Sequence, residues 1–348
     1  MKRALITGVT GQDGAYLSKF LLDKGYKVFG MYRRTANPNF WKLQTLNCLD
    51  KIHLIPADLS DASSILEAIR ISEPDEIYNL AAQSFVEASF AQPLSTADIT
   101  GLGLLRILEK VRQINPNIKV YQASTSELYG DGQKGLLNED TPFAPSSPYA
   151  SAKLFAYHTA KNYRRSYGIF VCNGILFNHE SPLRSLEFVT RKITNSVAKI
   201  KLGLEKELKL GNLEAKRDWG YALDYIECMW LMLQQDEPDD YVIATGETHS
   251  VKEFAQEAFN VLGLNWEEYV KVDSKFIRPE DVMYLQGDYS KAKNKLGWEP
   301  KVKFKELVKM MVDEDYKKWQ DCLAGKQFPW DAPYYVSDLN IISRTKRA

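Results

Sequence analysis

RALITGVTGQDG, residues 3–14, is the stretch that decides the fold of this 348-residue sequence. Its first five residues form a short apolar run, typical of a buried strand, and glycines follow at positions 8, 11 and 14. The next residues have the apolar spacing of a helix, which ends at Gly25. A glycine loop between a first strand and a first helix lets the backbone approach a pyrophosphate, whose charge the helix N-terminus stabilises.

The loop spacing is GxxGxxG, whereas the standard dinucleotide pattern is GxGxxG. A strand-to-helix turn that binds no ligand is therefore an alternative. The position of the loop, between the first strand and the first helix, favours a dinucleotide.

Apolar runs and helical patterns alternate through the first half of the chain. We predict further strands at 26–32, 53–56, 76–81, 118–123 and 170–177. Helical patterns lie near 61–72, 99–113 and 149–166. This alternation predicts an α/β fold with a doubly wound parallel sheet.

Sequence repeats and Pro/Gly-rich linkers are absent, which predicts a second, smaller domain interwoven with the first. We assign residues 1–178 plus about 212–246 to the Rossmann domain and about 179–211 plus 247–330 to the smaller one. Residues 331–348 form a C-terminal tail.

Charge and cysteine usage narrow the functional classes. Lys+Arg and Asp+Glu both number 45, which argues against binding nucleic acid or an anionic membrane through a basic surface. Apolar runs stay well short of the roughly 20 residues that span a bilayer, and the start of the chain lacks a secretory apolar segment, so we expect a cytoplasmic protein. The four cysteines are scattered, which predicts free thiols and no zinc site.

Arg33 and Arg34 stand at the end of the second predicted strand, where an NAD-binding protein would carry an acid. A guanidinium can pair with a 2′-phosphate, so the pair favours NADP; a solvated arginine pair is the alternative. Asp58, followed by Leu59, could hydrogen-bond the adenine amino group. Its competing role is capping the next helix.

Tyr149 and Lys153 lie one helical turn apart, behind a strand end that carries Ser124 and Thr125. A lysine ammonium beside a phenol would lower the pKa of the tyrosine and make it a usable base for an alcohol. Such pairs are also common as solvated neighbours on surface helices. Behind an NADP-type loop, the set indicates hydride transfer at a carbinol carbon.

The sequence resembles the extended short-chain dehydrogenase/reductase family, and within it the GDP-mannose 4,6-dehydratase family. The resemblance covers almost the whole chain. Its segments are GVTGQDG (8–14), YRR (32–34), YNLAAQS (78–84), STSELYG (124–130), SPYASAK (147–153), GILFNHESPLR (174–184), FVTRKIT (188–194), GNLEAKRDWG (211–220), DYIECMWLMLQ (224–234), RPEDV (278–282) and KLGWEP (295–300). Two departures are Phe85, where the family usually has His, and Thr35-Ala36, which replaces a pair of serines.

The resemblance implies a lyase that converts GDP-D-mannose to GDP-4-dehydro-6-deoxy-D-mannose with bound NADP. Tyr149 would take the 4-hydroxyl proton, Thr125 would orient that oxygen, Lys153 would hold the ribose, and Glu127 would remove the C5 proton. Related dTDP-glucose dehydratases carry an Asp where this chain has Ser126, which leaves the acid for the departing 6-hydroxyl open. The alternative to a catalytic role for Glu127 is that this residue is an acid solvated in a loop.

The remaining site residues also follow from the resemblance. Those expected to contact the cofactor are Gly8, Thr10, Gly11, Gln12, Asp13, Gly14, Arg33, Arg34, Asp58, Leu59, Leu80, Ala81, Ala82, Ser84, Tyr149, Lys153, His179 and Arg184. Those expected to contact the GDP-sugar are Ser84, Thr125, Glu127, Asn178, Val189, Lys192, Arg217, Arg278 and Asp281. His179 and Glu180 lack HExxH spacing, so we expect no metal.

The family also implies a homo-oligomer, a dimer or a tetramer. The segment from about Thr35 to Leu43 would reach a neighbouring subunit, and exposed aromatics there would form a contact surface. A monomer that folds this loop over its own cofactor is the rival. Alternative functions are dehydration of a related GDP-sugar such as a heptose, an epimerase or reductase of nucleotide sugars, and a non-catalytic NADP-sensing protein.

Overall fold

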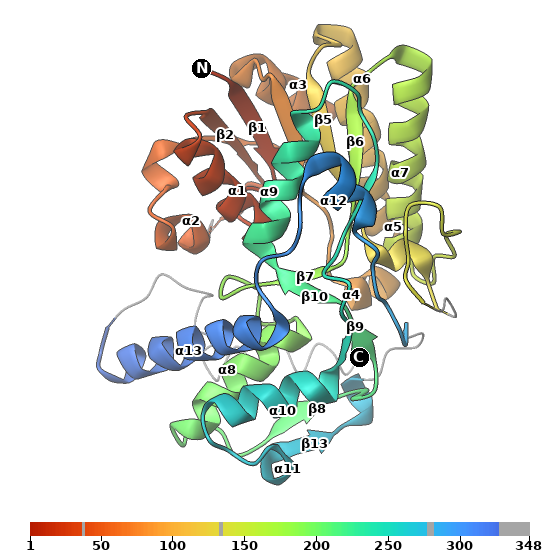
Figure 1. The fold of residues 1–348 in the computed structure, drawn as a ribbon. Coiled ribbons are helices and arrows are strands. Elements are labelled where there is room, and N and C mark those ends of the chain that lie inside the picture. The colour runs from red at the N-terminus through yellow and green to blue at the C-terminus, as the bar shows by residue number, and fades with distance from the viewer. Residues whose placement is uncertain (37–38, 132–134, 277–281, 327–348) are drawn as a thin grey trace.

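A parallel sheet of seven strands forms the centre of the computed structural model, which describes residues 1–36, 39–131, 135–276 and 282–326 (Figure 1). The strand order is β11-β6-β5-β4-β1-β2-β3, and every registered pair is parallel. The bounds are β1 Arg3–Thr7, β2 Lys27–Tyr32, β3 His53–Pro56, β4 Glu76–Asn79, β5 Lys119–Ala123, β6 Val171–Leu176 and β11 Tyr241–Ile243. The predicted doubly wound parallel sheet is confirmed.

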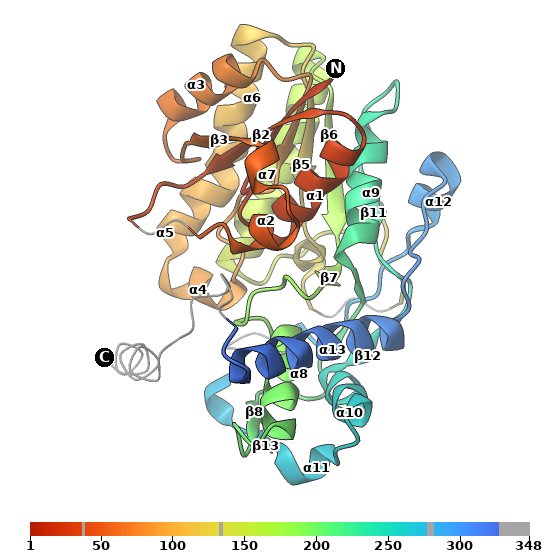
Figure 2. The ribbon, with the colours of Figure 1, turned by 90° about the vertical axis from the view of Figure 1, so that its left-hand side faces the viewer.

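Helices cover both faces of this sheet, which is why its strands are apolar on both sides. Helices α1 (Gln12–Asp23) and α9 (Ala222–Leu233) pack on one face. Helices α3 (Ala62–Ser72), α6 (Gly103–Ile114) and α7 (Pro148–Tyr167) pack on the other (Figure 2). Neighbouring residues of β1 alternate between the two cores, as the two-residue period of a strand requires.

The second part of the molecule lies beyond the carboxyl ends of the sheet strands (Figure 1). It contains α8 (Val189–Lys201), α10 (Val251–Val261), α11 (Trp266–Tyr269) and α13 (Phe304–Leu323), and the two-stranded sheet of β8 (Leu208–Leu210) and β13 (Val270–Val272). The apolar faces of α8, α10 and α13 share one core.

Some later segments pack across the predicted domain division. Helix α12 (Ser290–Leu296) packs against α9 and β11 of the sheet-bearing part, whereas Trp219 belongs to the core of the second part. The domain boundaries stay a prediction, and the tail at 331–348 lies outside the described residues.

Short strands connect the two parts. Strand β7 (Asn178–Glu180) pairs with β10 (Trp219–Tyr221), and β9 (Lys216–Arg217) pairs with β12 (His249–Ser250). Strands β7 and β10 lie between the large sheet and α8 (Figure 1). The NHE and RDWG segments of the sequence are therefore placed where the two parts meet.

The remaining elements are short. They are α2 (Trp41–Thr45), α4 (Val86–Ala91), α5 (Pro93–Thr96), a π-helical turn at Ala97–Leu102, and 3-10 turns at Leu49–Lys51, Ser126–Tyr129 and Ser274–Phe276. In the described part of the chain, we find no helix with the length and apolar character needed to cross a bilayer.

Candidate active site

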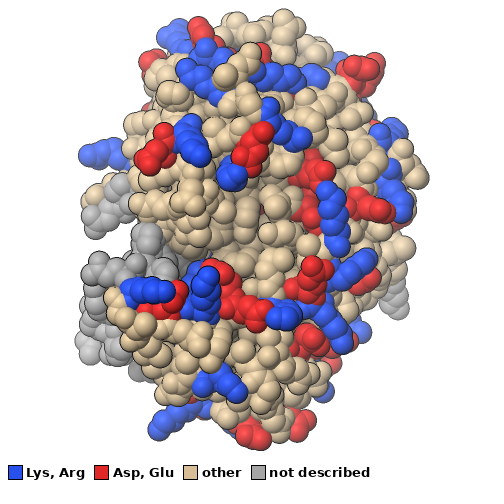
Figure 3. Space-filling view, turned by 60° about the vertical axis from the view of Figure 1, so that its left-hand side comes forward, with Lys and Arg blue, Asp and Glu red and all other residues tan. Residues whose placement is uncertain are grey.

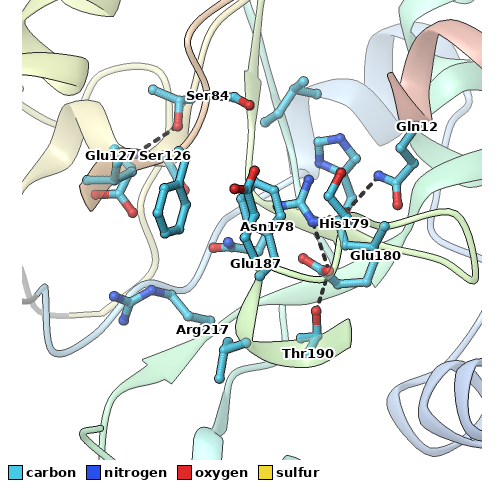
Figure 4. Close-up of a pocket in the computed structure, with 18 of the residues that line it drawn as sticks. Gln12, Ser84, Ser126, Glu127, Asn178, His179, Glu180, Glu187, Thr190 and Arg217 are labelled. Atoms are coloured by element: carbon cyan, nitrogen blue, oxygen red, sulfur yellow. Dashed lines mark hydrogen bonds and ion pairs between the residues drawn. The ribbon is translucent and has the colours of Figure 1, made fainter. Parts of the chain in front are cut away.

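A cavity of about 370 Å³ opens between the two parts of the molecule, at the carboxyl ends of the sheet strands (Figure 4). Its walls come from the loops after β1, β4 and β5, from β7, and from α7, α8 and β9. This edge is where open parallel sheets bind their ligands.

The glycine loop after β1 forms one wall of the cavity. Gly8 has φ of +69°, a conformation that favours glycine. A Cβ on Gly14 would lie 2.4 Å from the carbonyl oxygen of Gly8, so the third glycine allows α1 to approach the strand. Helix α1 begins at Gln12 without a side-chain cap, and its N-terminus faces the cavity. This cradle fits a dinucleotide pyrophosphate.

The first turn of α1 also binds the segment that starts with β7. The Asp13 carboxylate lies 2.9 Å from His179 Nε2, and His179 Nδ1 lies 2.8 Å from the carbonyl oxygen of Phe177. Gln12 donates to the His179 carbonyl oxygen and accepts from the Ser181 hydroxyl (Figure 4). The loop and the NHES segment are therefore linked directly through side chains.

The two acceptors around His179 determine its protonation. A carbonyl oxygen and a carboxylate can only accept, so both ring nitrogens donate and the ring is an imidazolium. Burial opposes both charges, but their mutual attraction outweighs it: the pKa of His179 is raised and the pKa of Asp13 is lowered to about 2.

The proposed base and its neighbours converge on the same cavity. Ser147 caps α7 by accepting from the Ala150 N–H, which places Tyr149 in the first turn and Lys153 one turn later. The Thr125 hydroxyl accepts from the backbone N–H of Glu127 at 3.2 Å and starts the turn at Ser126–Tyr129. Glu127 is only 9% exposed, which excludes the alternative of an acid solvated in a loop.

The pKa of Tyr149 differs from the sequence prediction. Burial raises it above its ordinary value, and the hydrogen bond with Thr125 opposes this only in part. Lys153 donates to the carbonyl oxygen of Ala123 at 2.7 Å, and burial lowers its own pKa to about 8. The predicted lowering by Lys153 is therefore wrong for this structure, because loss of solvation dominates at the phenol.

Arg184 is held in the cavity wall by two contacts. Its Nε lies 3.1 Å from a carboxylate oxygen of Glu180, which also accepts from the Thr190 hydroxyl (Figure 4). Its guanidinium carbon lies 3.5 Å from the centroid of the Phe188 ring. The guanidinium is thus fixed in orientation by an ion pair and by stacking.

Cationic groups also reach the cavity from the second part of the molecule. Lys192 Nζ lies 3.6 Å from the centroid of the Phe276 ring, and Arg217 donates to the carbonyl oxygen of Val282. Both side chains line the cavity, with Arg217 opposite the sheet-derived residues (Figure 4). Guanidinium and ammonium groups are suited to a diphosphate.

Most of the predicted site residues line this one cavity. They are Gly8, Gly11, Gln12, Asp13, Gly14, Leu80, Ala82, Ser84, Thr125, Glu127, Tyr149, Lys153, Asn178, His179, Arg184, Val189, Lys192 and Arg217. Thr10, Leu59 and Ala81 do not line it. Arg278 and Asp281 lie outside the described residues.

Arg33, Arg34 and Asp58 lie beside one another at neighbouring strand ends, away from the cavity. The arginines are exposed after β2, and Asp58 follows β3, which pairs with β2. Asp58 accepts from the N–H and hydroxyl of Ser60, whereas Asp61 caps α3. The alternative helix-capping role of Asp58 is therefore wrong.

The expectation of exposed aromatics between Thr35 and Leu43 is also wrong. Trp41 is 3% exposed and belongs to the core against α1 and α9. Phe40 is half-buried and packs edge-on against Tyr32. Residues 37–38 lie outside the described part.

Sequence reasoning did not assign several residues of the cavity wall. They include Phe85, Ser124, Glu180, Phe188, Thr190 and Phe276. Ser124 and Glu180 are next in sequence to predicted site residues, and this adjacency is the signal that could have identified them. Within the described ranges, no group of three or more His, Cys, Asp or Glu side chains could hold a metal.

Charges of both signs are interspersed over the face of the molecule shown in Figure 3, with uncharged areas between them. The lining of the cavity is likewise mixed: it includes Lys153, Arg184, Lys192 and Arg217, and also Asp13, Glu87, Glu127, Glu180 and Glu187.

Comparison with known proteins gives consistent matches. A family model described as GDP-mannose 4,6 dehydratase matches residues 5–311. GDP-mannose 4,6 dehydratase 2 of Arabidopsis thaliana is 54% identical over 326 residues, covering 90% of this chain and 87% of the relative. The Homo sapiens GDP-mannose 4,6 dehydratase is 51% identical over 338 residues, covering 90% and 91%. The UDP-glucose 4-epimerase of Thermus thermophilus, solved in complex with NAD, superposes with a TM-score of 0.79 at 27% identity, covering 90% and 98%.

Proposed function

Because this chain belongs to the GDP-mannose 4,6-dehydratase family, we propose that it converts GDP-D-mannose to GDP-4-dehydro-6-deoxy-D-mannose. The observation that carries this function is the identity of about half over nine-tenths of the chain, in a protein whose cavity collects Thr125, Glu127, Tyr149 and Lys153. Dehydration of a related GDP-sugar, such as a heptose, is the alternative within the same chemistry.

The cofactor is a nicotinamide dinucleotide, and we propose NADP. The glycine cradle at the N-terminus of α1 supports a dinucleotide, as does the likeness to a UDP-glucose 4-epimerase that binds NAD. The exposed Arg33 and Arg34 after β2 support a 2′-phosphate. The glycine cradle of Gly8, Gly11 and Gly14 would hold this dinucleotide, which when bound would supply the hydride acceptor for C4 of the hexose and the hydride donor for C6, so that the reaction has no net redox change.

The residues of the sheet edge supply the acid–base chemistry at C4. Tyr149 takes the proton of the 4-hydroxyl, and the Thr125 hydroxyl beside it orients that oxygen. Lys153, held by the Ala123 carbonyl oxygen, binds the ribose. Because burial raises the pKa of Tyr149 in this structure, the phenol must first lose its own proton before it can act as this base.

Elimination requires a second base, and Glu127 is the proposed one. A carbonyl at C4 acidifies the hydrogen on C5, and Glu127 lies two residues beyond Thr125 on the same strand end. Water then leaves from C6. Ser126 is a poor acid, so Glu127 itself is the candidate for protonating the departing hydroxyl.

The GDP portion is proposed to bind the wall from the second part of the molecule. Asn178, Val189, Lys192 and Arg217 line this side of the cavity. Arg278 and Asp281, also assigned from the family resemblance, lie outside the described residues. We further propose that the protein is a homo-oligomer and is cytoplasmic; the family resemblance supports the first, and the sequence patterns support the second.

Incubation of the purified protein with GDP-mannose and no added cofactor tests the function. The expected product is lighter than GDP-mannose by one water, as measured by mass spectrometry. UDP-glucose in a parallel incubation tests the epimerase alternative. Conversion of UDP-glucose without dehydration of GDP-mannose would overturn the proposal.

Extraction of the bound nucleotide from the same preparation tests the cofactor. NADP is expected as the dominant species, and Arg33→Ala should weaken NADP binding far more than NAD binding. NAD as the dominant species would contradict the assignment of Arg33 and Arg34.

A further inference from the structure

Ser124 carries a buried hydroxyl that the protein itself does not satisfy. The residue is 4% exposed and lines the cavity. Its Oγ has no hydrogen-bond partner among the described residues. Buried polar side-chain atoms nearly always have a partner, so each exception requires an explanation.

The neighbours of Ser124 are all engaged. The Ser124 N–H donates to the Gly174 carbonyl oxygen of β6 at 2.8 Å, which fixes the residue at the end of β5. The preceding carbonyl oxygen, that of Ala123, accepts from Lys153, and the following Thr125 hydroxyl accepts from the Glu127 N–H. Ser124 thus sits at a strand end with its backbone N–H paired and its hydroxyl unpaired.

A second unpaired polar atom lies on the same cavity wall. Asn178 Oδ1, at the start of β7, is buried and also lacks a partner in the described part of the chain. Two orphan polar atoms in one ligand cavity are best explained by a polar ligand that supplies the missing hydrogen bonds.

We propose that Ser124 is a further residue that contacts the bound reactants and donates a hydrogen bond to one of their oxygens. This inference rests on the proposed function. In the sequence, Ser124 lies between the residue whose carbonyl oxygen anchors Lys153 and Thr125. Lys153 is assigned to the cofactor ribose, and Thr125 is assigned to the sugar. The accepting oxygen therefore belongs to the nicotinamide carboxamide or to a hexose hydroxyl.

The variant Ser124→Ala tests the proposal through stability and affinity. Removing a hydroxyl that has no partner in the protein should leave the melting temperature without added ligand unchanged or higher. The affinity for the ligand that accepts this hydrogen bond should fall by about 3- to 10-fold, as expected for one hydrogen bond of ordinary net strength. Titrations with NADP⁺, GDP and GDP-mannose separate the sources. A loss for NADP⁺ assigns the carboxamide, and a loss for GDP-mannose but not for GDP assigns the hexose.

Ser72→Ala is the matched control. Ser72 is equally buried but donates to the Ala68 carbonyl oxygen at 2.6 Å, far from the cavity. This variant should have a lower melting temperature and unchanged affinities.

The proposal would be overturned if Ser124→Ala lowered the melting temperature without changing any affinity, as expected for Ser72→Ala. It would also be overturned if Ser124→Ala changed neither the melting temperature nor any affinity, which is the result expected if an ordered water satisfies the Ser124 hydroxyl. Failure of the unmodified protein to bind NADP⁺ and GDP-mannose would instead overturn the proposed function.

Discussion

Glu127 is the residue whose assigned role most separates a dehydratase from an epimerase or reductase. The variant Glu127→Gln keeps the side-chain shape and removes the basic carboxylate. It should form 4-keto-6-deoxy product about 10²–10⁴-fold more slowly, the usual contribution of a general base. Oxidation at C4 should persist, which reduced nicotinamide bound to the protein would reveal by its near-ultraviolet absorbance.

Two comparisons sharpen this measurement. In D₂O the unmodified protein should place deuterium at C5 of the product, whereas Glu127→Gln should exchange little. Tyr149→Phe, which lacks the base for the first step, should show neither the absorbance nor the exchange. Normal dehydration by Glu127→Gln would mean that another group removes the C5 proton.

The pair of Asp13 and His179 gives a pH-dependent contribution to stability. The pKa of His179 is raised, so this contribution is complete below about 6.5 and is lost as the pH rises through the folded-state value. The pKa of Asp13 is lowered to about 2, so its part is lost only as the pH falls below its ordinary value of 3.8. Asp13→Asn should therefore destabilise by about 1.5–3 kcal/mol near pH 5–6, and by less at alkaline pH.

Thermal unfolding of Asp13→Asn from pH 5 to pH 9 measures this difference. Asp61→Asn is the control, because Asp61 caps α3 with an exposed carboxylate and faces no histidine contact in the described structure. The destabilisation caused by Asp61→Asn should stay constant from pH 5 to pH 9. An effect of Asp13→Asn that is equally constant would mean that His179 is not charged.

At the residue level, the gathering of the predicted site residues was predictable, but their environment was not. The spacing of Tyr149 and Lys153, together with the family resemblance for Thr125 and Glu127, predicted one shared site, and all four residues line one cavity. The raised pKa of Tyr149 and the ion pair of Asp13 with His179 depend on burial and on contacts between residues 166 positions apart. Local patterns carry no information about either.

At the scale of elements, the long segments were predictable from the sequence and the short ones were not. The six strands predicted from apolar runs are present with small shifts at their ends. Strand β11 was not predicted, because its three residues are too few to show a period. The two-stranded pairs that place β7 and β9 are equally short, and their position depends on tertiary contacts.

Helices α8 and α13 are joined by a buried ion pair between Arg191 and Asp315. The Arg191 Nε donates to the carboxylate at 2.8 Å, and the Thr194 hydroxyl donates to it at 2.7 Å. Both charged side chains are almost fully buried. Arg191 also donates to the carbonyl oxygens of Pro182 and Arg184, so the pair fixes the loop that carries Arg184.

Asp315→Ala should destabilise the protein by about 3–5 kcal/mol, because it leaves the Arg191 charge buried without its partner. Chemical denaturation measures this value. Asp313→Ala on the same helix breaks an exposed pair with Lys309 and should change stability by less than about 1 kcal/mol. The double variant Arg191→Met/Asp315→Leu should be less destabilised than Asp315→Ala; a larger loss would contradict the desolvation argument.

At the scale of the whole molecule, exposed apolar side chains gather on the outer helices of the sheet-bearing part. Leu94 on α5 is 86% exposed, and Phe90 on α4, Leu102 in the π-helical turn and Phe155 on α7 are also exposed. These elements contact one another, so the four side chains lie on adjoining surfaces. We interpret this apolar surface as a candidate contact between subunits. The predicted contact of the segment at Thr35–Leu43 with a neighbouring subunit stays a prediction.

We therefore expect a second copy of this chain on the helices α4, α5 and α7. Light scattering at micromolar concentration should give at least twice the mass of one chain. The double variant Leu94→Glu/Phe155→Glu should shift this mass toward the monomer, because charged side chains at a self-complementary apolar interface repel their copies and resist desolvation. Leu323→Glu, at an exposed site on α13, should leave the mass unchanged. A monomeric mass for the unmodified protein would contradict the homo-oligomer, and an unchanged mass for the double variant would place the interface elsewhere.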